Sequence, residues 1–194
     1  KKRDDFKNLF KLWTNDLDIV PSEIWLDGYR NETSPEYIET LNRILIWAVK
    51  NYDTDTVSQV LSNPRVTPSY EEEGSYSGTA LRYAVEKGNW KIIDILLNDK
   101  RINLSSGFSI LGTAAAAGHL DIVKKLYQDP RVPKRSDQGL MGAVEAGRKH
   151  VINWFLDNTD VDPSINGNKA IIITSRDGYS DVVRKLLKDP RVNP

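Results

Sequence analysis

The sequence contains no cysteine and no long apolar run, and each absence removes a class of protein. Without cysteine, the chain cannot form disulfides, thiolate zinc sites, iron–sulfur clusters or a thiol nucleophile. No stretch of about 18 apolar residues is present, and charged residues fill the N-terminal KKRDDFKNLF, where a signal peptide needs an apolar core. These features predict an intracellular, cytoplasmic protein with no membrane insertion.

Neither sign of charge is in excess, because 27 Lys and Arg balance 27 Asp and Glu. No net field therefore draws the whole molecule to nucleic acid, and a nucleic-acid partner is not expected. No glycine-rich phosphate loop ends in Lys-Ser or Lys-Thr, and the segment GSYSG carries Tyr76 where a hydrolase has serine. The sequence thus predicts no catalytic residue, cofactor, metal site or small-molecule substrate.

What the sequence does contain is an internal repeat. Four glycines, Gly88, Gly118, Gly147 and Gly178, stand 30, 29 and 31 residues apart. After each glycine, apolar residues recur in the i, i+1, i+4 pattern of a helix with one buried face, and a shorter helical pattern with small residues precedes it. Each unit ends at Asp-Pro-Arg-Val or a related phrase, where proline stops the helix.

An earlier, degenerate unit carries Tyr52 at the glycine position, which brings the count to about five helix pairs. The fold class predicted is all-α, a helix-turn-helix solenoid with short turns between the pairs. Trp90 aligns with Leu120 in the next unit and is predicted to lie in the core.

The segment from Ala117 to Leu126, AGHLDIVKKL, resembles the central phrase of the ankyrin repeat, and the resemblance extends from about Leu41 to the C-terminus. The period is shorter than the usual 33 residues of that family, and the usual opening of the first helix is reduced to TALR at 79–82. The shorter period predicts short turns in place of the family's β-hairpin fingers, and the resemblance implies a structural hydrogen bond from His119 near its turn. The Asp-Pro-Arg-Val ending is similar to ankyrin arrays of giant viruses, amoebae and their intracellular bacteria.

Residues 1–40 do not follow the repeat and are predicted to form an N-terminal helical cap, because an end repeat has an apolar face to cover. Within them, residues 19–26 (IVPSEIWL) are similar to the opening of an F-box. The array then spans 41–194, and SYEEEGSYSG at 69–78 is an inserted acidic loop, which either contacts a basic partner or is solvated.

The resemblance implies a non-catalytic scaffold that binds a protein partner on the concave face of the array. An F-box-type substrate adaptor of a ubiquitin ligase and a structural subunit of a large assembly are the alternatives. Phe108 is the predicted anchor, since an exposed aromatic residue beside small alanines gives a desolvated contact, although it also suits a cap of its own turn. The other predicted contact residues are Glu86, Lys87, Ala116, Ala117, Asp137, Glu145, Asn168, Arg176 and Asp177.

A row of arginines recurs at the ends of the units, formed by Arg65, Arg101, Arg131 and Arg191. Stacked along one edge, it would present a cationic ladder to phosphate or carboxylate groups. The alternative is that these arginines pair with neighbouring carboxylates such as Asp129 and Asp189.

Overall fold

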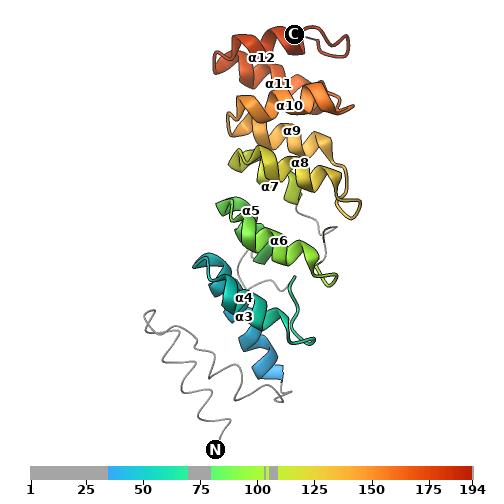
Figure 1. Ribbon diagram of the computed structural model, residues 1–194. Helices are drawn as coiled ribbons and strands as arrows, with labels where there is room; N and C mark the ends of the chain where they lie inside the picture. Colours follow the sequence, from blue (N-terminus) through green and yellow to red (C-terminus); the bar gives the residue numbers. More distant parts are fainter. Residues whose placement is uncertain (1–34, 70–79, 103, 105–108, 194) are drawn as a thin grey trace, which may run out of the picture. The chain divides into compact units, whose positions relative to one another are not determined.

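The computed structural model describes residues 35–69, 80–102, 104 and 109–193 (Figure 1). The F-box-like segment, nearly all of the acidic loop, Phe108 and residues 1–34 of the predicted cap lie outside this set. The described residues form helices and turns and contain no strand, as the sequence predicted. The helices are α3 (Pro35–Lys50), α4 (Thr54–Leu61), α5 (Ala80–Lys87), α6 (Trp90–Asn98), α7 (Ile110–Ala117), α8 (Leu120–Gln128), α9 (Ser136–Glu145), α10 (Lys149–Asn158), α11 (Ile165–Arg176) and α12 (Ser180–Leu186).

The chain divides into two compact units. The N-terminal unit comprises Lys1–Tyr83 and Asp94–Ile102, and the C-terminal unit comprises Ala84–Ile93 and Asn103–Pro194. Each unit is described by itself below.

In the N-terminal unit, α3 packs against α4 through apolar residues four positions apart. Leu41, Leu45 and Val49 of α3 are almost completely buried, which is what their helical spacing predicts. Tyr52 connects the two helices with a φ of 62°, the left-handed conformation that glycine usually supplies at this point of a helix pair. Asp53 then caps α4 by accepting a 3.0 Å hydrogen bond from the Thr56 amide.

In the C-terminal unit, the first helices of successive pairs are neighbours: α7 contacts α9, and α9 contacts α11. The second helices α10 and α12 also contact each other, and α7, α9 and α11 each pack against the second helix of their own pair. Leu111, Leu126, Leu140, Ile152 and Leu186 are fully buried between them. The core is therefore shared between neighbouring pairs, as stacked repeats require.

Two glycines of α9 allow an unusually close approach to its neighbours. A Cβ atom at Gly142 would lie 2.6 Å from the carbonyl oxygen of Gly112 in α7. A Cβ atom at Gly139 would overlap the buried ring of Phe155 in α10. Both positions therefore require glycine because of space rather than backbone conformation.

Trp90 departs from the prediction that placed it in the core. Its side chain is 44% exposed at the start of α6, and the ammonium of Lys125 lies 4.8 Å from the ring centroid. The alignment with Leu120 gave the wrong prediction because Leu120 is itself only half-buried. The position therefore tolerates an aromatic ring that lies along the surface.

Candidate functional site

The loops that join first and second helices in the C-terminal unit are tied to one another by side chains. His119 lies with Nε2 3.2 Å from the carbonyl oxygen of Glu86, and because a carbonyl only accepts, Nε2 is the donor. Arg148 donates from Nε to the carbonyl of Ala116 at 2.8 Å, one repeat later. We call the loops at 86–91, 116–121, 146–150 and 177–181 the loop row.

The glycines of the first three loops leave room for a side chain from the following repeat. Gly118 has a φ of 87°, and a Cβ there would lie 3.1 Å from Cδ of Arg148. At Gly88 the Cβ would lie 2.7 Å from the His119 ring. The left-handed backbone and the contact with the next repeat therefore both favour glycine at these two positions. The structural hydrogen bond predicted for His119 near its turn is confirmed.

Most of the predicted contact residues lie at the C-terminal ends of first helices, beside the loop row. Glu86 and Lys87 are exposed at the end of α5, and Ala116 and Ala117 are half-buried at the end of α7. Glu145 is exposed at the last position of α9. Because the bonds of the loop row join these loops in order, residues about one repeat apart in sequence come together along one side of the unit.

Three charged residues of the predicted set already have partners, Glu145, Arg176 and Asp177. Glu145 receives the Lys169 ammonium at 2.5 Å, and Arg176 pairs with Asp177 of the same turn at 2.8 Å. The Arg176 guanidinium holds the pKa of Asp177 below its usual range. All four groups remain open to solvent, so these pairs are weak and a partner can replace them.

Two predicted contact residues lie away from the loop row, at the opposite ends of their helices. Asp137 is exposed in the first turn of α9. Asn168 lies near the start of α11, in a left-handed stretch with a φ of 62°, and its side-chain oxygen accepts a 3.0 Å hydrogen bond from the Asn193 amide. Asn42 makes the equivalent bond to the Thr67 amide at 2.8 Å, which points to a structural role for both asparagines.

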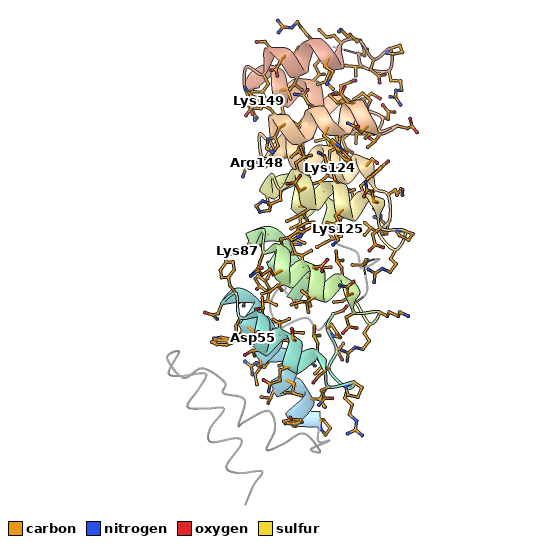
Figure 2. The ribbon with its side chains drawn as sticks, viewed as in Figure 1. Asp55, Lys87, Lys124, Lys125, Arg148 and Lys149 are labelled. Atoms are coloured by element: carbon orange, nitrogen blue, oxygen red, sulfur yellow. The ribbon has the colours of Figure 1, made fainter. Side chains whose placement is uncertain are left out.

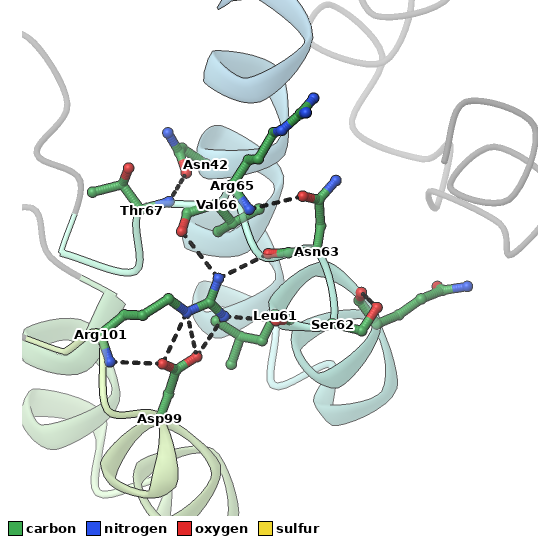
Figure 3. A network of polar contacts seen from close by, with 10 residues as sticks. Asn42, Leu61, Ser62, Asn63, Arg65, Val66, Thr67, Asp99 and Arg101 are labelled. Atoms are coloured by element: carbon green, nitrogen blue, oxygen red, sulfur yellow. Dashed lines mark hydrogen bonds and ion pairs between the residues drawn. The ribbon is translucent and has the colours of Figure 1, made fainter. Parts of the chain in front are cut away.

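Three of the recurring arginines at the ends of the units, Arg101, Arg131 and Arg191, are engaged within the protein. Figure 3 shows Arg101 of the N-terminal unit, which donates to the carbonyls of Leu61, Asn63 and Val66 at 2.6, 2.8 and 3.2 Å. The same guanidinium pairs with Asp99 at 2.6 Å and lowers the pKa of that carboxyl. One side chain therefore closes its own turn and ties it to the turn one repeat earlier.

The pattern recurs at two later turns in the C-terminal unit. Arg131 pairs with Asp129 at 2.8 Å, and Arg191 pairs with Asp189 at 2.6 Å. The Arg191 guanidinium lowers the pKa of Asp189 to about 2, chiefly through their side-chain hydrogen bonds. The prediction that Arg131 and Arg191 pair with Asp129 and Asp189 is thus confirmed, and these arginines do not form a free cationic ladder.

A family model described as ankyrin repeats, in three copies, matches residues 45–137 and 111–194, which together extend over most of the chain. The chain belongs to the ankyrin repeat family. Ankyrin repeats are generally protein–protein interaction modules, and the family is typically non-catalytic. None of the curated proteins with which the chain was compared matches it.

In this ankyrin array, sequence reasoning missed the tie made by Arg148 and the positions of two surface lysines. The ammonium of Lys149 lies 4.3 Å from the centroid of the Tyr179 ring, and Lys125 lies over Trp90 in the same manner. A signal was present, because His119, Arg148 and Tyr179 all directly follow a repeat glycine. Each of the three side chains lies against the glycine of the preceding loop, but a histidine, an arginine and a tyrosine share no motif that would reveal this in the sequence.

No metal site is formed by the part of the ankyrin chain that the structure describes, where no group of three or more histidine, aspartate or glutamate residues comes together. Within the same residues, no helix has both the length and the apolar character needed to cross a membrane.

Proposed function

We propose that this chain is a non-catalytic scaffold that binds a protein partner along the side of the C-terminal unit where the first helices end at the loop row. The observation that carries the proposal is the alignment of residues from α5, α7 and α9 on that side by hydrogen bonds between successive loops. Binding residues that are held in place before the partner arrives lose little conformational entropy when it docks.

The composition of this side also suits an interface. Ala116 and Ala117 are half-buried and small, whereas Glu86, Lys87 and Glu145 around them are exposed and charged. Protein interfaces commonly combine an apolar centre, which is desolvated on binding, with a polar rim that remains in contact with water. We infer that the two alanines form the centre of the contact.

The experiment that tests the proposal compares Ala117→Tyr with Gln128→Tyr. Both changes add the same neutral ring, but Ala117 ends α7 at the proposed surface and Gln128 ends α8, at an exposed position away from it. Tagged full-length chains would capture partners from a matched lysate, with quantitative mass spectrometry as the readout and thermal unfolding as the folding check.

We expect at least one partner to be reduced by about tenfold or more with Ala117→Tyr and to be retained with Gln128→Tyr, because a bulky residue at the centre of an interface prevents close packing. Identical partner sets for the two variants would overturn the proposal.

A further inference from the structure

Basic side chains lie on and beside the first three loops of the loop row, although the whole chain carries no net charge. Residues 86–91, 117–125 and 145–150 contain six lysines and arginines against three acidic residues. We call these six basic residues the cationic edge, and Figure 2 labels five of them. They are Lys87, Lys91, Lys124, Lys125, Arg148 and Lys149.

Most of the cationic edge has no carboxylate partner within the described residues. Lys87, Lys91, Lys124, Arg148 and Lys149 are all exposed, and none of them forms an ion pair there. Three arginines of the turns, Arg101, Arg131 and Arg191, are in contrast each matched by an aspartate two residues earlier in the sequence. The positive charge of the edge is therefore available to an external group.

Arg148 is held in a geometry that suits a carboxylate. Its Nε donates to the Ala116 carbonyl at 2.8 Å, and its aliphatic stem packs over Gly118. Within the described residues, the two terminal nitrogens of the guanidinium have no hydrogen-bond partner. This end of a planar guanidinium binds a carboxylate through two parallel hydrogen bonds, and here the group is ordered beforehand.

Lys149 is also held in place, because its ammonium lies over the ring of Tyr179 while remaining exposed. A cation positioned over an aromatic ring loses less freedom on binding than a free lysine does. Arg148 and Lys149 are adjacent in the sequence but reach opposite neighbours, Arg148 towards Ala116 and Lys149 towards Tyr179, so the edge offers one ordered positive group on each side of this loop.

We propose that the segment of the partner bound by the cationic edge is an acidic peptide, one carboxylate of which is clamped by Arg148. This inference rests on the protein-binding function proposed above and adds the chemistry of the partner. A peptide fits better than a nucleic acid because the positive surface is short: the next loop carries Asp177 and Asp181, and Glu86 lies beside Lys87. Nucleic acids are bound through extended rows of phosphate contacts.

The test uses a fluorescein-labelled decapeptide of glutamate and measures fluorescence anisotropy at about 50 mM salt, where surface charges are only partly screened. The edge variant is Lys87→Glu with Lys149→Glu. Its matched control is Lys100→Glu with Lys188→Glu, which changes the net charge equally at exposed sites outside the edge. A third variant, Arg148→Lys, keeps the charge but loses the planar group.

We expect the wild type to bind the glutamate peptide, the edge variant to bind it about tenfold or more weakly, and the control to stay within about twofold. Arg148→Lys should weaken binding by about threefold or more, because an ammonium cannot make the paired hydrogen bonds. Equal losses in the edge and control variants would overturn the proposal, since net charge alone would then explain binding. An unchanged affinity for Arg148→Lys would overturn the clamp.

A single-stranded thymidine decanucleotide serves as the competing polyanion. If it binds as tightly as the peptide and loses affinity in the same edge variant, the peptide assignment is wrong. The two proposals fail separately: a partner that is lost with Ala117→Tyr but retained by the edge variant would leave the protein-binding function intact and refute an acidic partner segment.

Discussion

Replacing Gly142 by alanine separates what helix propensity predicts from what packing predicts. Gly142 lies within α9 in regular helical conformation, where alanine is favoured by about 1 kcal/mol. The added Cβ, however, would lie 2.6 Å from the Gly112 carbonyl oxygen and 3.3 Å from its carbon. Propensity and packing therefore predict changes of opposite sign in the free energy of unfolding.

The size of the expected loss of stability follows from the atoms that the added Cβ would meet. A separation of 2.6 Å is far inside the optimal distance of about 3.5 Å between non-bonded heavy atoms. Because the neighbour is backbone rather than a side-chain tip, α7 and α9 must move apart, and overpacking of this kind costs about 1–3 kcal/mol. With the cost near the upper end and the propensity gain subtracted, we expect Gly142→Ala to lose about 2 kcal/mol.

The assay is urea unfolding followed by far-ultraviolet circular dichroism, with the denaturant slope checked for constancy. Ser175→Ala is the control, because Ser175 is exposed in α11 and an alanine there brings only the propensity gain. If Gly142→Ala were as stable as the wild type, or more stable, the close approach of α7 and α9 would be refuted.

Three further outcomes are expected. Gly88→Ala should cost about 1 kcal/mol more than Gly178→Ala in urea unfolding, because both alanines adopt a positive φ but only the first meets a neighbouring ring; equal costs would contradict this. Arg101 lowers the pKa of Asp99, so the Asp99 carboxylate stabilises the fold above about pH 4, and this contribution is lost as the pH falls below that value. The melting temperature of Asp99→Asn should therefore depend less on pH between about 5 and 2 than that of the wild type. An unchanged pH dependence would count against the ion pair of Asp99 and Arg101. Phe155 is fully buried, so Phe155→Ala should lose about 3–5 kcal/mol, and a loss below about 1 kcal/mol by calorimetry would be incompatible with that burial.

The repeat itself could be predicted from the sequence because one constraint governs it locally. A helix that must stop and reverse within a few residues favours a left-handed position, and glycine marks that position at four places. Tyr52 shows that the constraint belongs to the position and not to the residue type, since it adopts the same conformation with φ 62°. Apolar spacing then places the buried face of each helix.

The surface was harder to predict because it depends on contacts between repeats. Trp90 was assigned to the core by alignment, but whether a position is covered depends on the neighbouring unit. Arg131 and Arg148 look alike in the sequence, yet one is neutralised by an aspartate two residues earlier and the other has none. Phe108 lies outside the described residues, so its role as an anchor stays a prediction.

The hydrogen bonds of the loop row run in one direction along the chain. His119 donates to the loop before it, and so does Arg148, so the turns at Gly88 and Gly118 are each fastened by the repeat that follows in the sequence. These bonds add to the backbone bonds with which each turn closes itself, such as the bond from the His119 amide to the Ala114 carbonyl. Gly178 meets no such side chain among the described residues, and its turn is closed from within, by the bonds of the Gly178 and Tyr179 amides to the carbonyls of Ser175 and Thr174.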